Sequence, residues 1–126
     1  MIASDATNTR APAPAGERVL VVEDDYFIAQ DLCRALRGLG ATIVGPAPSI
    51  AAARTLLEQT VPDRVLLDIN LDGEYAFELA TQLQQRGMRL MFITGYDFAF
   101  IPPALQRVAR LQKPVDANVL AQGLAC

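Results

Sequence analysis

The chain has 126 residues, of which 52% are hydrophobic, and this suits a single domain with one buried core. Its formal net charge of −3 and its isoelectric point near 4.8 argue against a surface that binds nucleic acid directly. The absence of histidine excludes Ser/His/Asp and Cys/His catalysis and a phosphohistidine carrier, so we expect partners that are proteins and small ions.

The first 16 residues are rich in Ala, Pro, Thr and Ser and have neither a helical nor a strand period. We expect residues 1 to 16 to form a disordered leader and residues 17 to 126 to form the folded domain. No apolar run approaches the length that spans a bilayer, and the N-terminus lacks the pattern of a signal peptide. The sequence therefore predicts a cytoplasmic protein without membrane insertion.

Short apolar runs and helical patterns alternate from residue 18 onward. Residues 18 to 22 and 41 to 44 are predicted strands, and Gly45 and Pro46 are expected to end the second of them. The predicted helix between these strands spans residues 26 to 39, and Phe27 belongs to its expected apolar face. Ser49 is the predicted cap of a further helix, which contains Leu56 and Leu57.

The same alternation continues in the second half. Residues 65 to 67 form the predicted third strand, ending at Asp68, and a turn at residues 71 to 73 precedes a helix over residues 74 to 85. Residues 89 to 93 and 108 to 112 are predicted strands, and Asp116 is the expected cap of a final helix. The segment from residue 96 to residue 107 is poorly patterned and is expected to hold at most two helical turns.

Five strands that alternate with helices predict a parallel sheet covered on both faces. We therefore expect an α/β domain of the flavodoxin-like (βα)5 class, a doubly wound sheet with strand order 2-1-3-4-5. In this architecture, ligands bind beyond the carboxyl ends of the strands.

Polar residues follow four of the five predicted strands, and we expect them to meet at one edge of the sheet. Glu23 and Asp24 follow the first strand, Asp68 the third, Thr94 the fourth and Lys113 the fifth. Each residue alone has an ordinary explanation, because acids cap helices, threonines end strands and lysines are solvated. Their coincidence at matching strand ends is what predicts a functional site.

The chemistry of this set follows from its charges. Three carboxylates at one edge repel one another, and Mg²⁺ is the cation that prefers a few carboxylate oxygens together with retained waters. With the cation present, a carboxylate such as Asp68 can attack phosphorus and form an acyl phosphate. Lys113 and the hydroxyl of Thr94 would then stabilise the transferred phosphoryl group.

The chain resembles the receiver domains of bacterial response regulators, through VLVVEDD at residues 19 to 25, LLDIN at 66 to 70, ITG at 93 to 95 and LQKP at 111 to 114. The resemblance implies Mg²⁺-dependent phosphorylation of the protein by a sensor histidine kinase and signalling to a downstream protein target. It implies no enzymatic activity beyond the domain's own phosphorylation and dephosphorylation. It assigns Asp68 as the phosphoacceptor, Thr94 as the switch hydroxyl and Lys113 as the phosphate-binding lysine. The metal site that it implies consists of Glu23, Asp24, Asp68 and the backbone carbonyl of Asn70.

The resemblance also has a subgroup and two departures. Residues 92 to 96, FITGY, resemble the signature of the FAT GUY subgroup, which is often paired with histidine kinases of the HWE type. Arg110 stands where better-known receivers have an inward-swinging aromatic residue, and the segment from Thr94 to Lys113 is short. Asp25 is expected to cap a helix, with a metal role as the alternative.

Two other classes of protein remain as alternatives. A haloacid-dehalogenase-like phosphatase needs a second acid two residues after its nucleophile, but Asn70 is at that position. A pseudo-receiver that works without phosphorylation would lack the phosphoacceptor, an acid or the lysine, and all are present. Cys33 and Cys126 are expected to be a small core residue and a terminal thiol.

Overall fold

The structure is a computed structural model, and it describes residues 12 to 95 and 100 to 125. The main sheet consists of β1 (Arg18–Val22), β2 (Thr42–Ala47), β3 (Arg64–Asp68), β6 (Arg89–Thr94) and β7 (Ala109–Gln112). The helices are α2 (Tyr26–Gly38), α3 (Ile50–Gln59), α4 (Phe77–Gln85) and α5 (Ala117–Leu124). A two-stranded hairpin of β4 (Asn70–Leu71) and β5 (Glu74–Tyr75) and the 3-10 turn η1 (Pro103–Leu105) complete the described elements.

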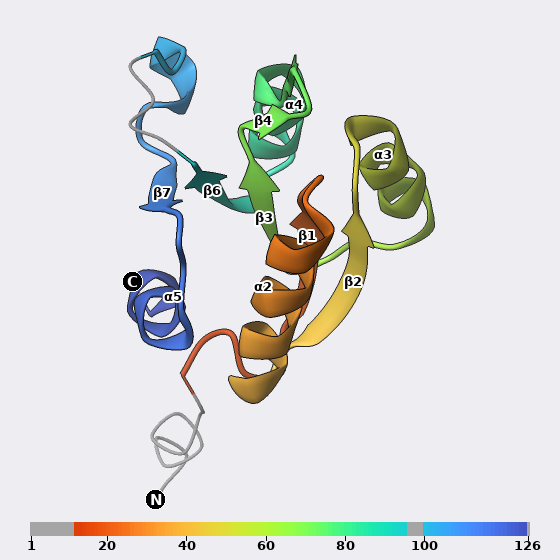
Figure 1. The fold of residues 1–126 in the computed structure, drawn as a ribbon. Helices are drawn as coiled ribbons and strands as arrows, with labels where there is room; N and C mark the ends of the chain where they lie inside the picture. The colour runs from red at the N-terminus through yellow and green to blue at the C-terminus, as the bar shows by residue number, and fades with distance from the viewer. Residues whose placement is uncertain (1–11, 96–99, 126) are drawn as a thin grey trace, which may run out of the picture.

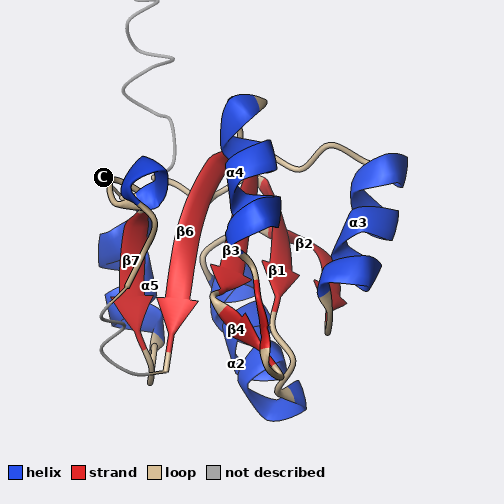
Figure 2. Cartoon of the chain, turned by 90° about the horizontal axis from the view of Figure 1, so that it is seen from above, coloured by secondary structure: helices blue, strands red, loops and turns tan. Residues whose placement is uncertain are grey.

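The main sheet is parallel throughout, with the order β2-β1-β3-β6-β7 (Figure 1). Counting only these five strands, this is the order 2-1-3-4-5, so the predicted flavodoxin-like fold is confirmed. In Figure 2 the strands of the main sheet point towards the same edge, beside β4. This edge is where the carboxyl ends of the strands bring distant parts of the chain together.

Helices cover both faces of the sheet. Successive side chains of β1 point to opposite faces of the sheet and belong to two hydrophobic cores. Val19 and Val21 face α2 and α5, whereas Leu20 and Val22 face α3 and α4. Figure 2 shows α4 in front of the strands and α2 and α5 behind them. Because β1 and β3 are buried on both faces, their near-continuous apolar sequences are those expected of inner parallel strands.

Three helices begin at the side-chain caps that the sequence predicts. The side chain of Asp25 accepts a hydrogen bond from the Ile28 amide at 3.0 Å, and that of Ser49 accepts one from Ala52 at 3.1 Å. Asp116 does the same for Val119 at 2.8 Å. Each cap satisfies an amide that the first helical turn would leave unpaired, so these helices start at fixed points after the strands.

The second strand does not end at Gly45 and Pro46 as predicted, because β2 runs through both to Ala47. β2 is an outer strand of the sheet, and prolines within sheets occur at outer strands and bulges because they have no amide hydrogen to donate. Its pairing with β1 shifts between Leu20 and Val22, and Gly45 takes a φ of +92° at this irregularity. The two residues therefore bend the strand instead of stopping it.

We expect Gly45→Ala to lower the free energy of unfolding by about 3 kcal/mol, because it adds a steric clash to the unfavourable φ. A Cβ atom at this position would lie 2.8 Å from the backbone nitrogen of Ala47. Gly87→Ala is the matched control, since Gly87 has a φ of +78° but open space around the added carbon. Its cost should be about 1 kcal/mol. Equal losses in urea unfolding for the two variants would contradict the clash.

The helix predicted over residues 74 to 85 begins instead at Phe77, three residues later than expected. The preceding residues form the hairpin of β4 and β5 around Asp72 and Gly73, whose φ values are +54° and +91°. Two successive positive φ values are characteristic of a tight two-residue hairpin turn. The predicted turn is present, and the residues after it return as a strand before the helix starts.

Residues 12 to 16, which we expected to belong to a disordered leader, form a turn on the domain in this structure. Pro14 is buried, and the amide of Gly16 donates to the carbonyl of Gly40 at 2.9 Å. The turn therefore contacts the segment after α2. Residues 1 to 11 lie outside the described residues.

Only η1 is helical in the described part of the chain between β6 and β7, in agreement with the expected limit of two turns. Residues 96 to 99, which include Tyr96 of the subgroup signature, lie outside the described residues, as does Cys126. Cys33, on α2, is buried in the hydrophobic core as expected. Within the described ranges, none of the helices is long and apolar enough to cross a membrane.

Candidate phosphorylation and metal site

The carboxyl ends of β1, β3, β6 and β7 bring acidic and basic side chains together. Glu23 directly follows β1, Asp68 is the last residue of β3, Thr94 is the last of β6 and Lys113 follows β7. Asp68 lies opposite Ile93 in the ladder, and the amide of Lys113 donates to the carbonyl of Thr94 at 2.7 Å. Backbone pairing between neighbouring strands therefore sets the positions of these residues.

Lys113 connects two of the acids directly. Its Nζ lies 2.9 Å from Oδ2 of Asp68 and 2.6 Å from Oε1 of Glu23, although its side chain is mostly buried. Burial alone would lower the pKa of Lys113, but its contacts with Glu23 and Asp68 outweigh this and raise the pKa. The lysine is therefore a fixed positive charge between the two carboxylates. The Lys113–Pro114 peptide bond is cis.

Asp68 is buried at the end of β3, and its two oxygens have different partners. Oδ1 accepts the amide hydrogen of Asn70 at 3.1 Å, while Oδ2 contacts Lys113. Asn70 in turn accepts the amide hydrogen of Gly73 with its side-chain oxygen at 2.8 Å. The β4–β5 hairpin thus fixes the backbone of Asn70 next to the carboxylate of Asp68.

Glu23 is the most buried acid of the site, with 2% of its surface exposed. Burial raises its pKa to about 7, although Lys113 and the amide of Asp25 oppose this shift. Its Oε2 accepts the Asp25 amide at 3.1 Å. Its Oε1 is buried without a hydrogen-bond donor of good geometry, because the contact with the Lys113 Nζ is short but poorly directed.

Glu23, Asp24 and Asp68 form an acidic cluster whose ligand oxygens lie within 4.8 Å of one another. Asp24 is the exposed member, and the other two are buried. The oxygen of Glu23 that lacks a well-directed donor and the excess of carboxylates over ammonium groups both fit a small divalent cation. The residues present therefore suit Mg²⁺, which takes carboxylate oxygens in preference to nitrogen or sulfur.

Two residues that the sequence left ambiguous have defined contacts. Asp25 caps α2 with its side chain and is not a member of the acidic cluster. Arg110 lies in β7 opposite Phe92, and its guanidinium donates to the carbonyl of Gln106 at 3.3 Å. The position of the usual aromatic switch is thus held by an exposed cation that contacts the end of η1.

The structure adds an exposed aromatic pair, Tyr26 and Phe27, and the predicted place of Phe27 was wrong. Phe27 is 76% exposed, although we expected it on the apolar face of α2, and Tyr26 is 68% exposed. Their rings meet edge to face, with centroids 5.5 Å apart, in the first turn after the acidic residues. Helical phase was the signal available for Phe27, which lies on the side of α2 opposite the buried stripe of Ala29, Leu32, Cys33 and Leu36. Tyr26 is in phase with this stripe but is exposed at the first position of the helix.

The sequence and the fold resemble those of known regulatory proteins. Residues 19 to 125 match the family model of the response regulator receiver domain. The positive alginate biosynthesis regulatory protein of Pseudomonas aeruginosa is 33% identical over 111 residues, which cover 84% of this chain and 45% of that protein. The phyllosphere-induced regulator PhyR of Methylorubrum extorquens is 27% identical over 128 residues, covering 95% of this chain and 48% of its own length. The chain therefore spans about half the length of these curated relatives.

Solved structures show the same arrangement. The solution structure of SdrG from Sphingomonas melonis Fr1 has a TM-score of 0.76 and 32% identity, and the match covers 86% of this chain and 92% of that one. The receiver domain of PhyR from Erythrobacter litoralis has a TM-score of 0.77, with 88% of each chain covered. Its identity of 24% supports the similarity of fold alone.

Proposed function

Since the chain belongs to the response regulator receiver family, we propose that it accepts a phosphoryl group on Asp68 from a histidine kinase. The reaction depends on Mg²⁺, and the phosphorylated domain signals by changed contacts with a downstream protein. The observation that carries this proposal is the position of Asp68. It lies buried at a strand end, 2.9 Å from Lys113 and inside a cluster of three acids.

The proposed transfer needs a nucleophile and positive charge around the moving group. A carboxylate oxygen of Asp68 forms the new bond to phosphorus, while the bond from phosphorus to the donor's imidazole nitrogen breaks and that nitrogen takes up a proton. Bound by Glu23, Asp24, Asp68 and the carbonyl of Asn70, Mg²⁺ would neutralise negative charge on the phosphoryl oxygens. Lys113 supplies further positive charge, and Thr94 supplies a hydroxyl donor at the neighbouring strand end.

We expect the kinase to bind this protein at the exposed aromatic pair. Tyr26 and Phe27 are exposed, in the first turn after Asp24 and Asp25. Exposed aromatic side chains are enriched at protein interfaces, where they contribute much of the binding energy. We place the donor over the start of α2, and residues 92 to 96 favour a kinase of the HWE type.

Exposure of the full chain to acetyl phosphate tests the proposal. We expect one added phosphoryl group by intact mass spectrometry in the presence of Mg²⁺, and no addition when a chelator removes the metal. The adduct should be stable in acid and labile in base, as expected of an acyl phosphate. If neither acetyl phosphate nor a kinase modifies the protein, the alternative is a receiver fold that binds partners without phosphorylation.

Lys113 and the metal compete for the same carboxylates, so we expect Lys113→Gln to bind Mg²⁺ about tenfold more tightly. The variant removes a positive charge that lies 2.6 and 2.9 Å from the oxygens of Glu23 and Asp68. Its phosphorylation should nevertheless be slower, because the same charge stabilises the transferred group. Arg110→Gln is the control, since Arg110 is an exposed cation on β7, the strand that directly precedes Lys113. Equal Mg²⁺ affinity of the two variants in calorimetry would contradict the competition.

A further inference from the structure

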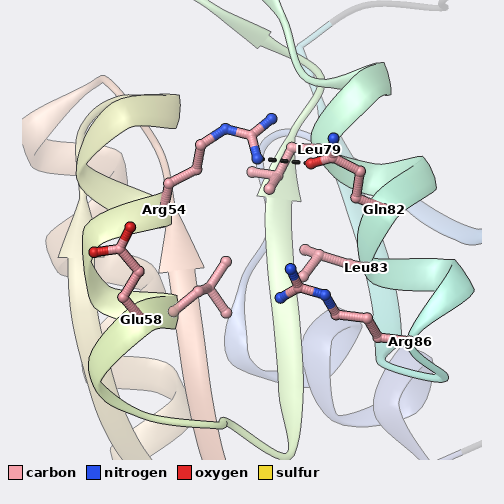
Figure 3. A pocket seen from close by; sticks show the side chains of 7 residues that line it. Arg54, Glu58, Leu79, Gln82, Leu83 and Arg86 are labelled. Atoms are coloured by element: carbon pink, nitrogen blue, oxygen red, sulfur yellow. Dashed lines mark hydrogen bonds between the residues drawn. The ribbon is translucent and has the colours of Figure 1, made fainter.

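A groove of about 250 Å³ lies between α3 and α4 and shares no residue with the acidic cluster (Figure 3). Leu57, Leu79 and Leu83 line it, and the last two belong to the buried core. Charged side chains from both helices stand around this apolar lining. Figure 3 shows Arg54 and Glu58 on α3, and Arg86 on the side of α4.

Arg54 extends across the groove to the neighbouring helix. Its Nη1 donates to Oε1 of Gln82 at 2.6 Å, as the dashed line in Figure 3 shows. Its Nη2 lies 3.7 Å from the largely exposed carboxylate of Glu78. Because the amide is neutral and the ion pair is long and solvated, most of the positive charge of Arg54 remains uncompensated.

Arg86 is the cap residue at the C-terminal end of α4, and its side chain points toward α3 in Figure 3. Among the described residues, neither Arg86 nor Glu58 has an ion-pair partner, although both line the groove. The lining of the groove therefore contains two guanidinium groups and one carboxylate in addition to the three leucines. Counted over the lining side chains, without the exposed Glu78 beside Arg54, the excess is a single positive charge.

We propose that this groove binds a small amphiphilic carboxylate, with its anionic group on Arg86 and its apolar body on the leucines. A single negative charge matches the excess charge of the lining, whereas the carboxylate of Glu58 would repel a phosphate dianion more strongly than a monoanion. Pockets for drug-sized ligands usually have volumes of about 300 to 1,000 Å³, and this groove, at about 250 Å³, lies below that range, so only a ligand smaller than a drug fits it. The apolar body would cover Leu57 and Leu83, and the guanidinium of Arg86 would gain the partner that it lacks.

Hexanoate is a suitable probe, because it combines one carboxylate with a short apolar chain. We titrate it into the full chain and follow the side-chain signals of Arg54, Arg86 and the groove leucines by NMR. The shifts should saturate with a dissociation constant on the order of 1 mM. Hexan-1-ol, which lacks the charge, and acetate, which lacks the apolar chain, should each bind at least about fivefold more weakly.

Two charge variants should change the affinity for hexanoate in opposite directions. Arg86→Gln removes the proposed partner of the carboxylate and should weaken binding about fivefold, while Glu58→Gln removes a repulsive charge and should strengthen it about twofold. Arg37→Gln is the matched control, because Arg37 is also near the C-terminal end of a helix, but on α2. Its affinity should equal that of the unaltered protein.

The proposal is overturned by shifts that do not saturate at about ten times the expected dissociation constant. It is also overturned if hexan-1-ol binds as tightly as hexanoate, or if Arg86→Gln and Arg37→Gln have the same affinity. Proton spectra of each variant verify that it is folded, and both altered side chains in the groove variants are exposed. These outcomes do not depend on the phosphorylation of Asp68.

Discussion

Replacing Asp68 by Asn is expected to abolish phosphorylation of the protein by acetyl phosphate or by a kinase. The amide lacks the nucleophilic carboxylate oxygen that must attack phosphorus. The fold should be kept, because the side-chain oxygen of the new Asn can still accept the Asn70 amide that Oδ1 of Asp68 accepts at 3.1 Å. Intact mass spectrometry after incubation with Mg²⁺ and acetyl phosphate measures the added group directly.

Asp72→Asn is the matched control for this experiment. Asp72 is an exposed acid in the hairpin only four positions after Asp68, and it is not part of the acidic cluster. We expect the control variant to be phosphorylated like the unaltered protein. An adduct that persists in Asp68→Asn but disappears in another acidic variant would assign the phosphoacceptor to a different residue.

Asp24→Asn should lower the affinity for Mg²⁺ by about a hundredfold, because a carboxylate that we propose as a direct ligand becomes a neutral amide. Asp24 is the exposed acid of the cluster, and its replacement leaves the buried contacts of Glu23 and Asp68 with Lys113 in place. The loss should therefore affect metal binding and phosphorylation while the midpoint of urea unfolding without metal stays nearly unchanged. Titration calorimetry with Mg²⁺ measures the affinity.

The neighbouring acid provides the comparison for Asp24. Asp25 caps α2, and asparagine is about as good a helix cap as aspartate. Asp25→Asn also removes one negative charge from the same edge of the sheet, so both variants change the general electrostatic attraction of the cation to a similar extent. We expect its Mg²⁺ affinity to fall only about twofold. If both variants lose Mg²⁺ affinity equally, the cation is attracted by the negative charge of this edge of the sheet and is not coordinated by Asp24.

The sequence was sufficient to predict where the site residues lie because each one ends an apolar run. Strand ends in a parallel sheet meet at one edge, so the positions of Glu23, Asp68 and Lys113 followed once the five strands were identified. The caps at Asp25 and Ser49 were predictable for a similar reason, since they depend on local backbone geometry alone.

Features that depend on which residues pair with one another, and not on the apolar pattern, were not predictable in this way. The continuation of β2 through Gly45 depends on its irregular pairing with β1, whose register shifts between Leu20 and Val22. The late start of α4 depends on the pairing of Asn70 with Tyr75 in the hairpin. The hydrogen bond from Arg110 to Gln106 depends on the path of the backbone from η1 into β7.

The bend in β2 has a consequence for the behaviour of the protein at high concentration. An open sheet has two outer strands, and their unpaired backbone groups can recruit another chain and begin aggregation. At Gly45 and Pro46 the outer edge of β2 is kinked and has no amide hydrogen at the proline, which prevents regular pairing with a second copy. The opposite outer strand, β7, has only 4 residues and includes the charged Arg110. The irregularity in β2 and the shortness of β7 therefore protect the two open sides of the sheet against fibre growth.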